Sequence, residues 1–392
     1  MLFLPAHMMR SNSTNRFGGE TMLGSLQAGR ALAAMAVLAF HLSVMFHEPR
    51  VGMPPILRDY TSHGWLGVNF FFVLSGFIIL LAHRRDIRRP ERAGNYVLKR
   101  FIRLYPIYWL VTIVALAGTL AVGGVKSFPT HPLDFASTLS LIHFNDFRAP
   151  IGPAWTLYHE VLFYAFFLCV IVHLRVGIGL MGAWLAIILG VNFFGATGDS
   201  LFWSTFVAPN NINFFLGIAA FGIMQKAPSR SIGGWILVAG LIAIPVTYGW
   251  ERTLMLAPGV MAPPFIQIAY STAFMLIVAG AAAMEKHGMV LTLPFLSLIG
   301  DASYILYLAH ESVASMMLKL LKKVVLLTSI PHVPLYLGIL VATIAACVIA
   351  YLLVEAPLLR LLRTLLIGRK TAAPPVRDQD QDRNFAPEGN PA

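Results

Sequence analysis

The chain is poor in charged residues. Asp, Glu, Lys and Arg make up 12% of its 392 residues, against about 25% in an ordinary soluble domain. Hydrophobic residues make up 57%, and the mean hydropathy is +0.71. This composition excludes a large soluble domain. Because about 20 apolar residues cross a bilayer as a helix, the chain has room for about ten spans joined by short loops.

Cysteine is also scarce, and no targeting signal is evident. Cys169 and Cys347 lie in separate apolar stretches, and neither has a neighbour at metal-binding or redox spacing. Residues 1–21 lack the order of positive charge followed by an apolar run that marks a secretory signal. We therefore predict no metal site, no redox motif and no cleaved leader.

Acidic residues are outnumbered by basic ones, which gives a net charge of +11 and a pI near 9.8. The basic residues sit in short segments between apolar runs rather than along one face, so we predict no nucleic-acid binding. Eight of them fall between the second and third apolar stretches, which makes that loop cytoplasmic by the positive-inside rule. These eight are Arg84, Arg85, Arg88, Arg89, Arg92, Lys99, Arg100 and Arg103.

The predicted fold is an all-α polytopic membrane protein with about ten transmembrane helices and both termini in the cytoplasm. We expect a cytoplasmic tail over 1–22, a transmembrane domain over 23–366 and a disordered cytoplasmic tail over 367–392. Lys322 and Lys323 would face outward and depart from the pattern. The expected spans are 24–46, 65–82, 104–123, 154–173, 177–195, 204–224, 232–250, 264–284, 297–318 and 334–355.

The first span carries two ionisable residues, Arg30 and His41. Such groups are costly inside a bilayer, so each needs a partner or a function. Their spacing is 11 residues, almost three helical turns, so both project from one face about 16 Å apart. A snorkelling arginine and a histidine bonded to a backbone carbonyl would be the purely structural alternative.

Two later spans carry further polar residues. Glu160 begins the fourth span and is expected to hydrogen-bond an inward histidine such as His41, or else to pair with Arg148 at the rim. In the ninth span, Ser303, Tyr307 and His310 recur at i, i+4 and i+7 and form a polar stripe. That stripe must face the bundle interior or a water-filled cavity, and helix–helix hydrogen bonding would also explain it.

Arg100 and Arg103 enter the third span from the cytoplasmic side. Arginine forks suit phosphate groups, although positive-inside anchoring explains the spacing as well. Pro150 to Pro153 closes an outer segment, 124–153, that is long enough to cover the mouth of a site.

Several motifs follow one another along the chain: Leu26–Arg30 with Phe40-His41, Gly67–Ile78, Arg100–Arg103 with Tyr105–Tyr108, Ala154–Glu160 with Phe163-Tyr164, Gly300–Tyr304 with Leu308–His310, and Val354–Pro357. Taken together, these motifs resemble the acyltransferase-3 family of integral membrane O-acyltransferases, from residue 24 to about 363. Asn69 and Asn213 depart from the family pattern, where Asp and Glu are usual.

The resemblance implies transfer of an acyl group, most often acetyl, from cytoplasmic acyl-CoA to a hydroxyl of a carbohydrate. That reaction needs a cationic group for the CoA phosphates, for which Arg30, Arg100 and Arg103 are the candidates, and a path for the acyl arm, which Ser75 is expected to line. His41 would be the general base and Glu160 the group that orients it, because imidazole titrates near neutral pH. The carbohydrate would contact Trp155, Tyr158, Tyr307 and His310, although an interfacial aromatic belt explains the first two equally well.

The expected location is the bacterial inner membrane, with acyl-CoA, a carbohydrate acceptor, the lipid bilayer and glycan assembly or export machinery as partners. No permanently bound cofactor is expected. A proton-coupled transporter or exporter, or a non-catalytic partner of glycan export, would use the same buried polar residues as a pathway. The lack of a clear internal repeat weakly disfavours transport.

Overall fold

The computed structural model describes residues 16–17, 20–21, 23–47, 57–121, 128–195, 198–254, 262–324 and 331–368. Over these residues the chain is an assembly of α-helices, as predicted. The long helices are α1 (Gly24–His47), α3 (Leu66–His83), α4 (Ala93–Ala121), α6 (Trp155–Val172), α7 (Leu174–Phe194), α9 (Ile212–Lys226), α10 (Arg230–Thr253), α11 (Pro264–Lys286), α13 (Ser303–Val324), α14 (His332–Ala350) and α15 (Ala356–Leu366).

Shorter elements connect these helices. Two strands of two residues each, β1 (Arg16–Phe17) and β2 (Glu20–Thr21), pair antiparallel before α1. Most of the predicted tails, 1–22 and 367–392, lies outside the described residues. The remaining short elements are α2 (Arg58–Thr61), α5 (Pro132–Ser140), α8 (Leu201–Phe206), α12 (Pro294–Asp301), the 3₁₀ turns η2 (Pro90–Arg92), η3 (Gly152–Ala154) and η4 (Pro209–Asn211), and the π-helical turn η6 (Tyr351–Glu355).

Nine candidate spans in the described residues are long and apolar enough to cross a membrane. They correspond to nine of the ten predicted spans. The exception is the predicted span 297–318, which the structure forms as α12 followed by α13. Because α13 carries Glu311 and Lys319, it is less apolar than the others. It is nevertheless packed against α1, α4 and α14.

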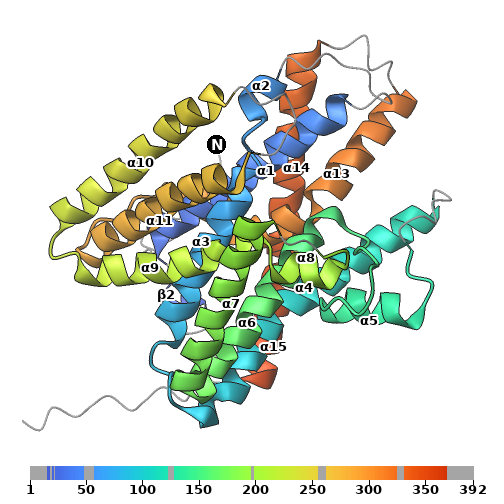
Figure 1. Cartoon of the computed structure of the whole chain (residues 1–392). Helices are drawn as coiled ribbons and strands as arrows, with labels where there is room; N and C mark the ends of the chain where they lie inside the picture. The colour runs from blue at the N-terminus through green and yellow to red at the C-terminus, as the bar shows by residue number, and fades with distance from the viewer. Residues whose placement is uncertain are drawn as a thin grey trace, which may run out of the picture.

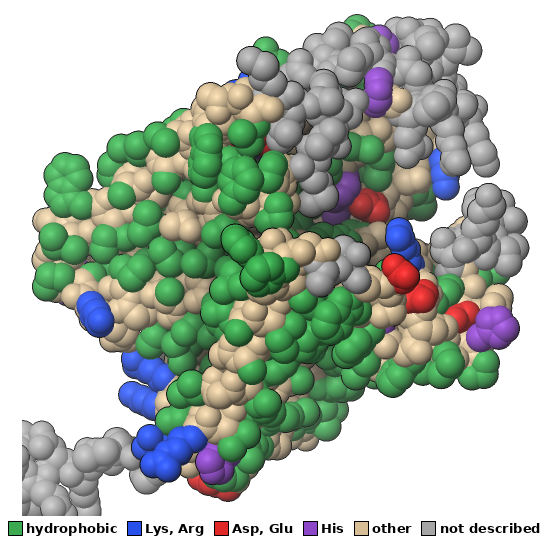
Figure 2. Space-filling view, viewed as in Figure 1, with side chains coloured by type: hydrophobic (Ala, Val, Ile, Leu, Met, Phe, Trp, Pro, Cys, Tyr) green, Lys and Arg blue, Asp and Glu red, His purple; other side chains and the backbone are tan. Residues whose placement is uncertain are grey.

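The helices pack in neighbouring groups around α1 and α3 (Figure 1). Helix α10 runs beside α11, α6 beside α7, and α3 against α9, while α1 contacts α3, α12 and α13. Hydrophobic side chains cover most of the face in Figure 2, and several Lys and Arg side chains gather toward its lower left edge. This distribution is typical of a lipid-facing surface bounded by a charged end.

Close approach of α3 and α9 depends on glycine. A Cβ atom on Gly76 would collide with the backbone carbonyl of Phe214, and one on Gly217 would collide with that of Val73. Small residues at such crossings let two membrane helices bring their backbones together. This contact holds α3 in place. Ser75, the residue before Gly76 in α3, lines the pocket described below.

The outer segment is held to the bundle by aromatic donors. The hydroxyls of Tyr105, Tyr108 and Tyr158 and the indole of Trp109 donate to the last carbonyls of α5. At the other end of α5, the backbone N–H groups of His131 and Thr130 donate to Asp134 and hold the pKa of its carboxyl below its usual range. The segment that follows α5 leads to η3, which packs on α6 and α13.

We expect Gly217→Ala to destabilise the protein by about 1–3 kcal/mol, because the added methyl forces α9 away from α3. Thermal unfolding in detergent measures the change. Gly222→Ala on the same helix is the control, since a Cβ there meets nothing within 4 Å. Equal melting temperatures for the two variants would contradict the proposed glycine contact.

Candidate active site

The site begins where α1 lies against α12 and α13. Arg30 is buried, and its Nε donates to the Ser303 hydroxyl at 3.0 Å. One turn earlier, the Gln27 amide donates to Asp301 at 2.6 Å. Further along α1, His41 is hydrogen-bonded to His310, which lies on α13 as Ser303 does. The prediction that Arg30 and His41 share one face of the first span is therefore confirmed, and the partner of that face is α13.

His41 lies between a histidine and a carboxylate. Its Nδ1 is 3.0 Å from His310 Nε2, and its Nε2 is 3.4 Å from Glu311 Oε1. His310 is 1% exposed, whereas the side chains of His41 and Glu311 are 31% and 29% exposed. The cluster is thus anchored in the bundle on one side and open on the other.

Hydrogen bonding fixes the tautomers of both imidazoles. His310 Nδ1 is 2.7 Å from the Tyr307 carbonyl and 3.2 Å from the Leu306 carbonyl. Carbonyl oxygens only accept, so Nδ1 of His310 carries the proton and its Nε2 accepts from His41 Nδ1. Neutral His41 then has a proton-free Nε2, which is the form that a general base requires.

A pocket of about 860 Å³ runs through the bundle from the charged end. Its lining includes residues of α3 from Val68 to Ala82, which at 1.5 Å per residue is about 21 Å of that helix. Tyr307 lines the pocket, its carbonyl accepts from His310 Nδ1, and its ring centroid lies 6.1 Å from that of His310. One residue of the pocket wall therefore contacts the histidine pair, which is not itself among the lining residues.

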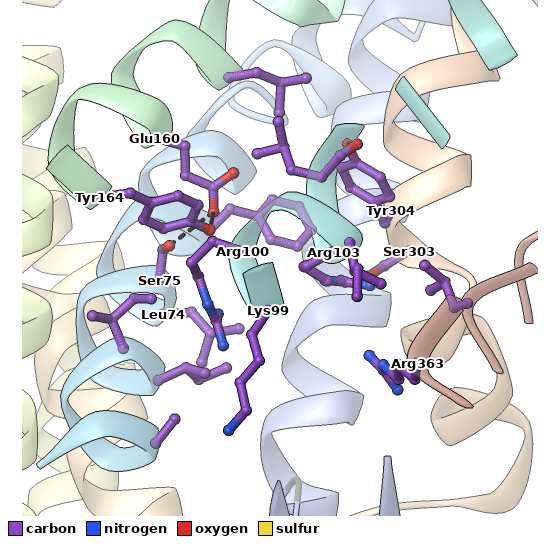
Figure 3. A pocket seen from close by; sticks show the side chains of 18 of the residues that line it. Leu74, Ser75, Lys99, Arg100, Arg103, Glu160, Tyr164, Ser303, Tyr304 and Arg363 are labelled. Atoms are coloured by element: carbon purple, nitrogen blue, oxygen red, sulfur yellow. Dashed lines mark hydrogen bonds between the residues drawn. The ribbon is translucent and has the colours of Figure 1, made fainter. Parts of the chain in front are cut away.

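Basic side chains from several elements line the pocket, and Figure 3 shows Lys99, Arg100, Arg103 and Arg363 around it. Arg100 comes from α4 and donates to Nε2 of His83, whose Nδ1 donates to Asp86 at 2.9 Å. This arrangement holds one arginine fork in place at the pocket wall. The other lining Lys and Arg residues are Arg30, Arg85, Arg89 and Arg92.

Arg103 faces a buried carboxyl group. Its Nη1 lies 3.5 Å from Oε1 of Glu355, which is fully buried, and its guanidinium sits over the Tyr304 ring at 5.1 Å. Glu355 ends the π-helical turn η6, and π-turns are frequent at functional sites. The closing motif Val354–Pro357 therefore supplies a carboxyl group to the pocket wall.

Glu160 does not contact His41 in this structure, nor is it paired with Arg148. Its Oε1 accepts hydrogen bonds from Ser75 at 2.9 Å and from Tyr164 at 2.8 Å, as the dashed lines in Figure 3 show. Both Ser75 and Glu160 line the pocket. The carboxylate beside His41 is Glu311, because α13 and not α6 packs along that side of α1.

The predicted acceptor residues are dispersed. Tyr307 lines the pocket, and His310 belongs to the histidine pair outside the pocket lining. Trp155 is 46% exposed and packs edge-on against His159. Tyr158 is buried, stacks on His143 and donates to the Ser137 carbonyl, so in this structure it supports the outer segment.

The two asparagines that depart from the family pattern are both buried and lie outside the pocket lining. Asn69 is buried and donates to the Ser271 hydroxyl at 3.0 Å, which joins α3 to α11. Asn213 is buried in α9. Neither residue is among those that line the pocket.

Sequence reasoning gave no role to Glu311, Glu355 or His83. Glu311 follows His310 in the predicted ninth span, and Glu355 lies in the motif Val354–Pro357, but neither sequence context indicates a function for the residue. His83 sits at the end of an apolar run, where a polar residue is ordinary. Only the packing of α3, α4 and α13 shows which side chains these three meet.

The described residues thus combine a bundle of candidate membrane spans with a basic pocket and a histidine pair beside a carboxylate. The acyltransferase-domain family matches residues 23–352. The chain belongs to the acyltransferase-3 family and is a membrane O-acyltransferase.

Three relatives are similar to this chain. The exopolysaccharide production protein ExoZ of Rhizobium meliloti is 30% identical over 311 residues, which are 76% of this chain and 90% of that protein. The peptidoglycan O-acetyltransferase OatA of Listeria monocytogenes is 29% identical over 94 residues, 24% of this chain and 13% of that protein. Protein 2 in the picA locus of Rhizobium radiobacter is 27% identical over 157 residues, 34% of this chain and 74% of that protein. No solved structure shows a significant match.

The histidine cluster also has the spacing of a metal site, since ligand atoms of His41, His310 and Glu311 lie within 4.8 Å of one another. The direct hydrogen bond between the imidazoles uses the His310 lone pair that a metal would need. We therefore expect protein equilibrated with zinc chloride and then desalted to retain well under one zinc per chain. Elemental analysis measures this, and a full equivalent that His310→Ala removes would identify a metal centre instead.

Proposed function

We propose that the protein transfers an acetyl group from cytoplasmic acyl-CoA to a carbohydrate hydroxyl, with His41 as general base. The observation that carries this proposal is a basic pocket whose lining residue Tyr307 contacts a histidine pair in which His41 Nε2 is proton-free. Polyanionic CoA fits the charged end of the pocket, because arginine forks bind phosphate oxygens in bidentate fashion. The acyl-pantetheine arm would then extend along α3 toward Tyr307.

In the proposed reaction, His41 Nε2 takes the proton of the acceptor hydroxyl as its oxygen attacks the thioester carbonyl. The C–S bond breaks, the acyl group becomes an oxygen ester, and the CoA thiolate leaves and is protonated. His310 keeps His41 in the reactive tautomer through the hydrogen bond at 3.0 Å. Glu160 fixes the Ser75 hydroxyl and Tyr164 in the pocket wall, where the acyl arm would pass.

A carbohydrate acceptor is supported by two of the relatives. One carries a name that refers to exopolysaccharide production, and another a name that specifies peptidoglycan O-acetylation. The open side of the His41 cluster adjoins the outer segment at Gly152. We therefore place the acceptor on the outer side of a bacterial inner membrane, where glycan assembly or export machinery would present it.

We expect His41→Gln to lower the turnover of acetyl-CoA-dependent transfer by about 10²–10⁴-fold, the usual contribution of a general base. Radiolabelled acetyl transfer to isolated glycan, normalised to folded protein, measures the change. His47→Gln is the matched control, because His47 is exposed at the end of the same helix. Full activity of the His41 variant would remove it from the mechanism.

Arg100→Gln and Arg103→Gln are each expected to raise the Michaelis constant for acetyl-CoA by about 10–100-fold, since a charge-assisted hydrogen bond contributes about 1.5–3 kcal/mol. S-acetylpantetheine, which has no phosphates, should serve both variants as well as it serves the unmodified enzyme. Arg175→Gln is the control, because Arg175 is exposed at the start of α7. An unchanged Michaelis constant for acetyl-CoA would mean that the two arginines only help to orient the chain in the membrane.

A further inference from the structure

The space between His41 and Glu311 has two hydrogen-bond acceptors facing each other. His41 Nε2 is proton-free in the neutral pair, and Glu311 Oε1 lies 3.4 Å from it. An ionised carboxylate only accepts hydrogen bonds. Two acceptors at this spacing need donors from a third group, and both side chains are open enough for a ligand to reach them.

We propose that Glu311 binds the hydroxyl next to the one that is acylated, so that the acceptor is a vicinal diol. This inference rests on the proposed function and adds to it the chemical class of the acceptor. A single alcohol supplies one proton and satisfies only His41 Nε2. Adjacent gauche hydroxyl oxygens lie about one hydrogen-bond length apart, so a diol supplies the second donor at the position of Glu311.

Gly152 of η3 borders the carboxylate of Glu311. A Cβ on Gly152 would collide with that carboxylate and displace it. Glycine at this position therefore leaves room for the carboxylate where it lies beside His41. On the other side, His310 is locked to the backbone of α13 by two carbonyls.

A simpler role for Glu311 would be an ion pair with protonated His41. In that role the carboxylate would act on the base and would affect every acceptor equally. In the proposed role it acts on the acceptor, so its removal penalises diols and spares simple alcohols. The two roles therefore differ in acceptor selectivity, which a merely structural residue would not change.

The test uses the full chain in detergent with acetyl-CoA as donor and two probes, cis-1,2-cyclohexanediol and cyclohexanol. The unmodified enzyme should favour the diol by about tenfold or more in kcat/KM, the size of one hydrogen bond to a charged group. Glu311→Gln should lower kcat/KM for the diol to nearly the value for cyclohexanol, and leave cyclohexanol unchanged. Asp146→Asn, the same exchange on the outer segment, should keep the preference.

Gly152→Ala provides a second variant that retains the Glu311 charge but displaces the side chain. It should lose the preference for the diol in the same way. An equal fall for both probes in Glu311→Gln, or an undiminished preference in either variant, would overturn the role of Glu311 while the proposed function stands. If the unmodified enzyme released no CoA with either probe or with glycan, the proposed function would fail, and this inference with it.

Discussion

The contact between α1 and α13 is the constraint on which the site depends. Both helices carry polar side chains within an apolar bundle, where an unpaired polar group is costly. Arg30 donates a hydrogen bond to Ser303, and His41 is hydrogen-bonded to His310, so both polar residues of α1 have a partner on α13. The same pairing constrains the placement of α13, because a rotation of either helix would separate Arg30 from Ser303 and His41 from His310.

This contact also arranges the chemistry along the bundle. Arg30 of α1 lines the basic pocket. Further along α1, His41 lies beside Glu311, which in turn lies against Gly152 of the outer segment. Tyr307 connects the two, since it lines the pocket and its carbonyl accepts from His310 Nδ1. In the proposed function, a charged donor would stay at the basic end while only its acyl arm approaches the histidine pair, so that no phosphate would enter the apolar interior.

Sequence patterns predicted the helical fold and nine of its candidate spans, because hydrophobic runs of membrane length have few alternatives. They also predicted that Arg30 and His41 share a face, which depends only on helical periodicity. The pairing of Glu160 with His41 was wrong for this structure. Glu160 and Glu311 are both single carboxylates in apolar surroundings, and nothing in their local sequence tells which helix packs beside α1.

The sequence alone determined that the chain is a membrane-embedded bundle and which of its few polar residues needed partners, because burial of charge in lipid is costly wherever the helix lies. Only the tertiary structure decided which residues became partners. Helix packing brought Glu311 to His41, Ser75 to Glu160 and Glu355 to Arg103, each across a large separation in sequence. The spacing of residues along one helix does not show which helices pack against it, so only the tertiary structure identifies Glu311 as the carboxylate beside His41.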